Sequence, residues 1–286
     1  MRLAISLLLL VCTVACTPAA VKLTPISDLP TASPSLHPSA TSRLLTSTLH
    51  TSTPNPDSLP TAAALQAFEA CSPLESYELA QLPELVSNAF NPPPPGSDDP
   101  HHGVDLADLL PGSQVAVSGR RVQAVLPGQV AGIIIDRFPY GNALLVETPL
   151  DRLPAAWLDH LYLPQPAEGA PVHTSLTCPP EALEPWPDQG ERSLYLLYAH
   201  LEETPALQAG DWVACGQAIG SVGMSGNALN PHLHLEVRVG PSGAGFTSLA
   251  HYDPGATLEE MAAYCTWRVG GRFIAIDPLN LFLPAP

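Results

Sequence analysis

Positive charge is scarce in this sequence of 286 residues. Lys and Arg together number 11 against 27 Asp and Glu, which gives a formal net charge of −16. Binding to nucleic acid or to an anionic membrane surface relies on neutralisation by Lys and Arg. We therefore expect no nucleic-acid partner and no membrane contact through surface charge. Charged residues make up only 13% of the chain, which disfavours long charged helices.

Long apolar runs are also missing, apart from one at the start. Residues 3–14 are apolar and follow the basic start Met1-Arg2. The run is too short to cross a bilayer, which takes about 20 residues, and it is typical of a secretory signal. It ends in Thr13-Val14-Ala15-Cys16, which resembles a bacterial lipoprotein box, although Leu is preferred where Thr13 stands. We predict a signal peptide over 1–16 and lipidation of Cys16, with ordinary signal cleavage as the alternative.

Either processing route predicts a mature chain outside the cytoplasm, anchored at the bacterial cell envelope or secreted. Four cysteines then remain: Cys71, Cys178, Cys215 and Cys265. They lack the Cys-x-x-Cys spacing of structural zinc sites, and an even number in an oxidising compartment indicates two disulfides. Of three possible pairings we favour Cys71–Cys265 with Cys178–Cys215. Free buried thiols are the alternative.

Proline is abundant, with 34 residues, and argues against long helices. Residues 17–62 form a Ser/Thr/Pro tract without apolar periodicity, which predicts a disordered stalk. Residues 63–99 are interpreted as an N-terminal extension with short helices and the polyproline connector "NPPPPG". His37 and His50 in the stalk are expected to be incidental.

From residue 100 to the end, short runs rich in Val, Ile and Leu alternate with glycine-containing turns. This pattern predicts an all-β domain over 100–286. The alternation of short apolar runs and turns is absent at about 149–192. This stretch is long and Pro-rich, and we interpret it as an insertion at one rim of the sheet. His160 and His173 in it are expected to have no site role. A second loop is expected at 240–264, before the last strand.

The stretch "NPHLHLEV" at 230–237 places polar residues at every second position. Side chains at i and i+2 of a strand share one face. We therefore predict that His232, His234 and Glu236 share one face, and that Leu233 and Leu235 face the core. Two solvated histidines on a strand surface are the alternative.

Two further segments contain candidate metal ligands or catalytic residues. In "HHGVDLA", His101 and Asp105 flank Gly103, where a sharp turn would bring both onto one centre. His102 is expected to point away from that centre. In "LLYAHLEE", His200 ends an apolar run and is placed near a strand end, where functional residues often lie. The alternative for "HHGVDLA" is a surface loop with a chance pair of histidines. The alternative for His200 is a histidine of the core or rim.

Together these segments supply three candidate zinc ligands and two spare imidazoles. A catalytic zinc site keeps three protein ligands and a water, whereas a structural site closes with four. The spare imidazoles suit proton transfer. No nucleotide-binding loop or nucleophile elbow is present to favour another enzyme class.

The sequence resembles the lysostaphin-type, or LytM-like, zinc metalloendopeptidases. The resemblance is carried by six segments and by their order along the chain: "HHGVD", "GQVAGII", "YGNALLVE", "YAHL", "GDWVACGQAIGSVGMSGNALNPHLHLEV" and "IDPLNLF". The resemblance covers about residues 101–282, interrupted by the insertion. It implies a compact antiparallel sheet of the duplicated-hybrid-motif type. This chain differs from the family at two places. Leu229-Asn230-Pro231 stands where the family usually has Thr-Gly-Pro before the His pair, and Leu235 stands where it usually has Phe.

The resemblance also implies roles. His101, Asp105 and His234 match the zinc ligands, for one Zn²⁺ per chain. His200 and His232 match the two catalytic histidines, used as general base and transition-state stabiliser. Asn142 matches a recurrent Asn without an assigned role.

The implied activity is hydrolysis of peptide bonds in peptidoglycan stems or cross-bridges, by a monomer whose membrane contact is the lipid anchor alone. One alternative is a latent LytM-like module that binds or activates other wall hydrolases. Another is a surface protein that merely binds wall glycan or metal. All five key positions carry the residues that the family uses, which favours the enzyme. The insertion leaves the substrate range open.

Overall fold

This computed structural model describes residues 70–161, 163–164, 173–184 and 190–283. All of them belong to the unit Ala62–Pro286. The expected signal peptide, the lipidation site Cys16, the stalk and the start of the extension lie outside the described residues. Among the described helices, none combines the length and apolar character needed to cross a bilayer.

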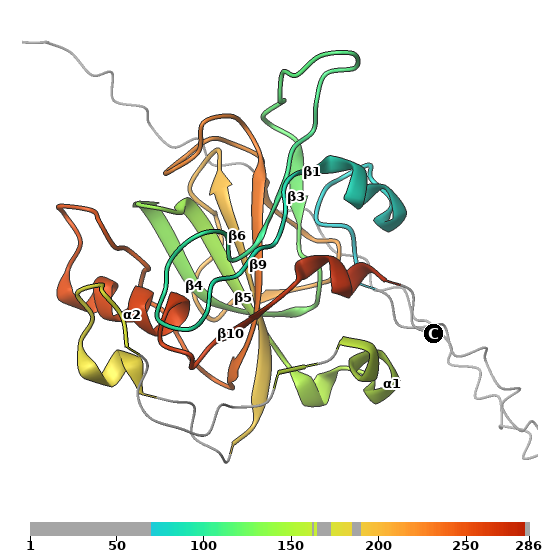
Figure 1. Cartoon of the computed structure of the whole chain (residues 1–286). Helices are drawn as coiled ribbons and strands as arrows, with labels where there is room; N and C mark the ends of the chain where they lie inside the picture. Colours follow the sequence, from blue (N-terminus) through green and yellow to red (C-terminus); the bar gives the residue numbers. More distant parts are fainter. Residues whose placement is uncertain (1–69, 162, 165–172, 185–189, 284–286) are drawn as a thin grey trace, which may run out of the picture. The chain divides into compact units, whose positions relative to one another are not determined.

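Antiparallel strands are the predominant regular structure among the described residues, as the sequence predicts. One sheet has eight strands, in the order β1-β2-β9-β6-β5-β4-β7, with β10 also paired to β9. β3 and β8 form a second, two-stranded sheet. Figure 1 shows β4, β5, β6 and β9 side by side at the centre. The strands are β1 (Val86–Asn88), β2 (Val104–Leu106), β3 (Arg121–Gln123), β4 (Gly128–Arg137), β5 (Gly141–Pro149), β6 (Arg192–Leu201), β7 (Trp212–Val213), β8 (Ala218–Ser221), β9 (Leu233–Pro241) and β10 (Ile274–Ile276).

The central strands are apolar on both faces because both faces of the large sheet are covered. On one face, Leu196 and Leu235 pack in a buried cluster with Val122 and Ile219 of the two-stranded sheet. On the other face, Leu197 belongs to a second buried cluster that is rich in aromatic residues. Strands buried on both faces need continuous apolar runs rather than strict alternation, which explains the sequence of β6.

Short helices fill the connections, and one longer helix was not predicted. The helices are η1 (Leu79–Leu85), η2 (Leu150–Arg152), α1 (Ala155–Leu158), η3 (Asp159–Leu161), η4 (Pro180–Leu183), α2 (Leu258–Arg268) and η5 (Pro278–Phe282). The short helical segment expected before residue 90 is present as the 3₁₀ helix η1. The expectation of a loop over 240–264 is wrong for its last part, where α2 begins. Thr257 and Glu260 form a reciprocal capping box there, a sequence feature that starts helices.

Helix α2 covers the sheet face that carries the aromatic cluster. Tyr264 and Trp267 of α2 are fully buried in this cluster with Phe246 and Phe273. Trp267 and Phe246 pack edge to face, with ring centroids 5.7 Å apart. The helix is therefore held on the sheet by large aromatic side chains.

The cysteines are paired, but the favoured pairing is wrong. Cys71 bonds to Cys215, and Cys178 bonds to Cys265. Cys71 N and Cys215 Sγ both contact the carbonyl oxygen of Val125, at 2.9 and 3.2 Å, so the backbone near β3 brings these two together. Such proximity depends on tertiary structure and cannot be derived from cysteine spacing.

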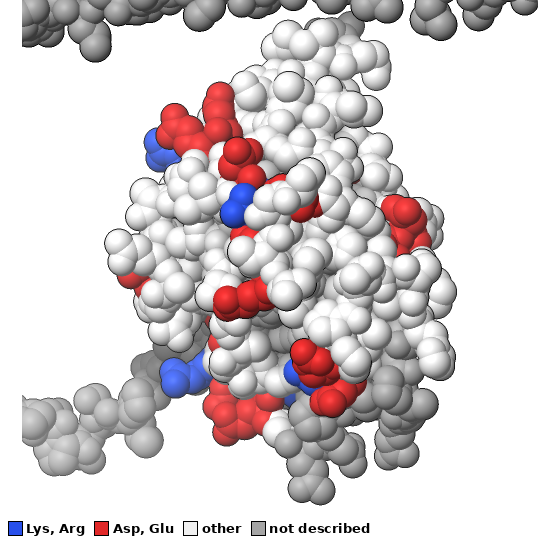
Figure 2. Space-filling model, turned by 90° about the vertical axis from the view of Figure 1, so that its left-hand side faces the viewer, with Lys and Arg blue, Asp and Glu red and all other residues white. Residues whose placement is uncertain are grey.

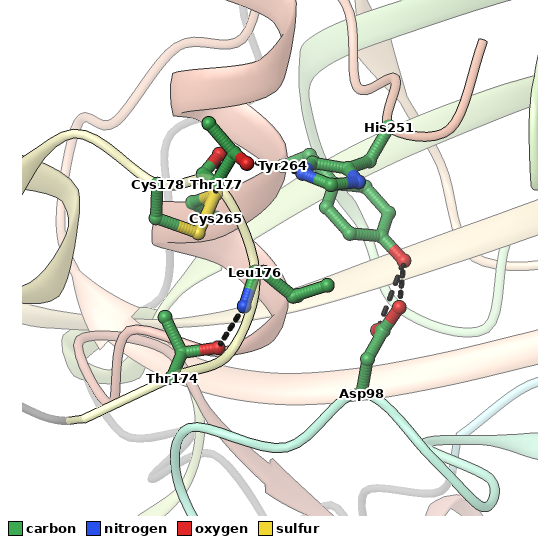
Figure 3. Close-up of a disulfide and its surroundings, with 8 residues drawn as sticks. All are labelled: Asp98, Thr174, Leu176, Thr177, Cys178, His251, Tyr264 and Cys265. Atoms are coloured by element: carbon green, nitrogen blue, oxygen red, sulfur yellow. Dashed lines mark hydrogen bonds between the residues drawn. A yellow bond between two sulfur atoms is a disulfide. The ribbon is translucent and has the colours of Figure 1, made fainter.

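The second disulfide attaches the insertion to α2. The insertion occupies the interval between β5 and β6, as predicted, and its described part contains η2, α1, η3 and η4. Figure 3 shows Cys178 of the insertion bonded to Cys265 of α2, near Thr174 and Leu176. His173 is exposed, and nothing is described of the side chain of His160.

Candidate active site

The three predicted zinc ligands lie together at the β2–β9 pair, near the start of β9. Asp105 of β2 and His234 of β9 are directly paired in register. Asp105 Oδ1 lies 2.7 Å from His234 Nδ1 and 3.1 Å from His101 Nε2. One potential ligand atom from each residue lies within 4.8 Å of the other two, and all three residues are buried.

Two backbone features place His101 beside that pair. His101 and Asn91 exchange two backbone hydrogen bonds of 3.1 Å, which fixes the segment just before β2. A Cβ at Gly103 would clash with the carbonyl oxygen of Leu235. The glycine is therefore required by the close approach of β2 to β9, rather than by the sharp turn that we expected.

Hydrogen bonds set which ring nitrogen of each ligand histidine faces the site. His101 Nδ1 donates to the carbonyl oxygen of Ala89 at 2.9 Å. His234 Nε2 donates to Glu236 Oε1 at 3.1 Å. Each ring is then left with a lone pair on the nitrogen nearest Asp105. Two imidazole nitrogens and one carboxylate oxygen are a donor set that suits zinc, so the residues fit the expected ion.

Asp105 is also supported by a residue that the sequence analysis missed. Asn88 Nδ2 of β1 donates to Asp105 Oδ2 at 3.1 Å. Burial opposes ionisation of Asp105, but it is outweighed when His101 or His234 carries a proton on the nitrogen nearest Asp105, and the pKa of Asp105 then lies below its usual value. A bound cation would take the place of these protons. The carboxylate is thus ready to act as an anionic ligand. No sequence pattern links Asn88 to Asp105, because β1 joins β2 only in the folded sheet.

The two predicted catalytic histidines lie on the same side of the site. The ring centroids of His200 and His232 are 4.8 Å apart. His232 Nε2 lies 3.6 Å from Asp105 Oδ1. His200 Nδ1 donates to the carbonyl oxygen of Ser225, and His232 Nδ1 to that of Asn230, both at 2.8 Å. In the neutral form of either imidazole, the lone pair is therefore on Nε2.

A β-bulge directs His200 toward the site. Strand alternation alone would place His200 on the face of Tyr198, away from His234. The register of β5 against β6 shifts between Asn142 and Leu144, and His200 has a left-handed φ of 62°. Bulges re-aim side chains, and strained backbone is concentrated at functional sites.

Burial keeps two of the histidines neutral. Burial, with the neighbouring His234 and His232, lowers the pKa of His200 to about 3. Burial and nearby Arg238 lower the pKa of His102 to about 2. His102 Nδ1 accepts a hydrogen bond from Arg238 Nη2 at 2.7 Å, so it points away from the ligand group, as expected.

The five side chains open into a cleft of about 320 Å³. Its rim includes the fully exposed Leu229 and the exposed Asp99. Asn142 does not line it; instead Asn142 Oδ1 accepts from the backbone N–H of Asp136 at 3.1 Å, in the β4–β5 turn. The site offers two imidazoles and a carboxylate that can bind a metal ion, with two further imidazoles beside them in an accessible cleft. These groups suit metal-assisted hydrolysis.

The chain is similar to known peptidases. The model of peptidase family M23 matches residues 188–245, which include His200, His232 and His234. The catalytic domain of the antimicrobial peptidase lysostaphin from Staphylococcus simulans is 19% identical, with a TM-score of 0.33, over 57% of this chain and 86% of that one.

Two further solved structures are similar at the same level. A mutant catalytic domain of the prophage-encoded M23 protein EnpA from Enterococcus faecalis is 17% identical, with a TM-score of 0.32, over 60% of this chain and 92% of that one. A zinc-containing peptidase from Vibrio cholerae is 21% identical, with a TM-score of 0.30, over 59% of this chain and 35% of that one. The match of the M23 model over residues 188–245 confirms, for that segment, the peptidase resemblance that the motifs predict.

Proposed function

We propose that this protein is a zinc-dependent endopeptidase that hydrolyses peptide bonds in bacterial peptidoglycan. The observation that carries the proposal is the convergence of His101, Asp105 and His234, with His200 and His232 beside them, at one cleft. The family match supports the peptidase activity. The peptidoglycan substrate rests on the resemblance of the motifs.

His101 Nε2, Asp105 Oδ1 and His234 Nδ1 would hold the ion. Zinc bound by three protein ligands supplies Lewis-acid chemistry, which lowers the pKa of a water and polarises a carbonyl. The chain's own contribution to the reaction is then proton transfer and orientation.

His200 and His232 would transfer the protons. Their Nδ1–H groups are bound to carbonyl oxygens, so Nε2 of one ring accepts the proton of the attacking water. The protonated imidazole then donates to the nitrogen of the leaving amine. The other ring, in its imidazolium form with a proton on Nε2 as well as on Nδ1, donates to the oxyanion that develops on the scissile carbonyl, where electrostatic stabilisation acts.

We also propose that the protein works outside the cytoplasm, tethered to the envelope through Cys16 by the stalk of residues 17–62. The Cys71–Cys215 and Cys178–Cys265 disulfides support this location, because disulfides persist in oxidising compartments. A tether would keep the domain over 100–286 near the wall. With an acidic surface, recognition of the wall would depend on the cleft rather than on charge.

The test is release of new amino groups from purified peptidoglycan by the mature domain. We expect release by the native chain and none by His234→Ala, because the variant lacks one of three metal ligands. His173→Ala is the matched control, since His173 is exposed in the insertion, and it should retain full release.

Absence of release from a folded, zinc-loaded native chain would overturn the proposed activity. It would favour the latent module that binds or activates another hydrolase. Deleting part of the insertion would then distinguish a blocked cleft from an inactive one, because only a blocked cleft gains activity.

A further inference from the structure

Glu236 of β9 is a fully buried carboxylate at the centre of a polar cluster behind His234. Its Oε1 accepts from His234 Nε2 at 3.1 Å, from Tyr140 OH at 2.9 Å and from Arg268 Nη1 at 2.8 Å. Its Oε2 accepts from Arg238 Nε and Nη2, each at 3.0 Å, and from Trp267 Nε1 at 3.1 Å. Burying such a group is costly unless it is paired and fully hydrogen-bonded.

The contact with His234 decides which nitrogen of that ring carries the proton. With Nε2–H donated to Glu236, Nδ1 keeps its lone pair toward Asp105 and the candidate metal site. If the proton moved to Nδ1, this nitrogen would donate to Asp105. One proton shift would then block the ligand atoms of both His234 and Asp105.

Helix α2 supplies two of the groups that hold Glu236. Trp267 and Arg268 are consecutive residues at the end of this helix, and both donate to the carboxylate. Arg268 also pairs with Asp98, three residues before His101. Tyr264 OH of the same helix donates to Asp98 at 2.9 Å, as Figure 3 shows. The helix thus contacts the support of His234 and the segment that leads to His101.

We propose that Glu236 is a positioning residue for the ligand His234, and that helix α2 is the element that holds Glu236 in place. The inference rests on the metal site of the proposed function. Partners that accept the second ring N–H of a metal-bound histidine fix its tautomer, and their loss commonly weakens metal binding 10- to 100-fold. The role of α2 then goes beyond covering the aromatic cluster.

The test measures zinc affinity without substrate, by competition with a chromophoric chelator. Glu236→Gln is expected to weaken zinc binding by about 10- to 100-fold, and to change the visible absorption spectrum of the Co²⁺-loaded protein. The matched control is Glu147→Gln. Glu147 is also a buried carboxylate on a strand, but it binds Ser193 Oγ and the backbone N–H of Gly243, and its variant should bind zinc as the native chain does.

A second variant tests the contribution of α2 with less risk to folding. Trp267→Phe keeps a smaller aromatic ring in the cluster and removes the N–H donated to Glu236. It should weaken zinc binding by a smaller factor than Glu236→Gln, and the double variant should be no weaker than Glu236→Gln alone. Tyr198→Phe, which alters a buried tyrosine on the opposite sheet face, should leave the affinity unchanged.

Native zinc affinity in a folded Glu236→Gln protein would overturn the inference. If that variant does not fold, native affinity in folded Trp267→Phe overturns it instead. A native chain that binds zinc but cleaves no peptidoglycan would reject the proposed activity and leave this inference standing. A native chain that binds no zinc would reject both.

Discussion

Each of the four site histidines is fixed by one hydrogen bond on the nitrogen that faces away from the site. Backbone carbonyl oxygens fix His101, His200 and His232, whereas the Glu236 carboxylate fixes His234. The motifs predict all four histidines by number. They predict none of the carbonyl partners, because a carbonyl group is present at every residue and only the fold selects one.

Adjacent histidines provide a direct test of the ligand assignment. His101→Ala should abolish stoichiometric zinc binding because it removes a ligand. His102→Ala should retain zinc but lower the free energy of unfolding by about 1–3 kcal/mol, since Arg238 loses a buried acceptor. Metal content by atomic absorption and denaturant unfolding measure the two effects. Loss of zinc from His102→Ala alone would reverse the assignment.

The two catalytic histidines should separate metal binding from turnover. His200→Ala and His232→Ala should each bind zinc while turnover falls by about 10²- to 10⁴-fold, the usual contribution of a general acid or base. Zinc content and amino-group release are measured on the same preparation. Full turnover in either variant would remove that residue from the catalytic pair.

Strand periodicity, at the scale of elements, predicts the two faces of β9 correctly. Leu233 and Leu235 are buried in the core, and His234 and Glu236 lie on the opposite face. Periodicity does not predict the bulge at His200, because the register of β5 against β6 depends on both strands and their turns. Helix α2 was missed although its capping box is present in the sequence.

The capping box of α2 gives a pH-dependent prediction. A hydrogen bond from Thr257 N, with further bonds from Arg137, lowers the pKa of Glu260 below its usual value. A depressed carboxyl pKa stabilises the fold above the pKa of the unfolded chain, and this contribution is lost as the pH falls through the folded pKa. Glu260→Gln should therefore be less stable than the native chain at pH 7.

Urea unfolding of both proteins between pH 7 and pH 3.5 measures this difference. The gap in the free energy of unfolding should stay constant above the ordinary glutamate pKa of about 4.3 and narrow below it, since Glu260 is protonated first in the unfolded chain and then in the native one. Glu259→Gln, one residue away in the first turn of α2, is the control and should show a smaller pH dependence. A gap that stays constant over this range would contradict the role of the Glu260 charge.

At the scale of the whole molecule, the order of the motifs predicts the fold and the meeting of distant segments. His101 and His234 are 133 positions apart and still approach to 3.2 Å. Composition predicts an acidic surface, and Figure 2 shows one face on which acidic side chains are more widespread than basic ones. The disulfide pairing and the attachment of the insertion to α2 could not be predicted, because they depend on which loops meet at the rim of the sheet.

The most direct test is a zinc titration of the metal-free mature domain, followed by release of amino groups from peptidoglycan. The account predicts no release before addition, a linear rise with added zinc, and a plateau at one ion per chain. His232→Ala should reach the same binding endpoint with release lowered by about 10²- to 10⁴-fold. Full release from the metal-free domain in the presence of a strong chelator would contradict the account.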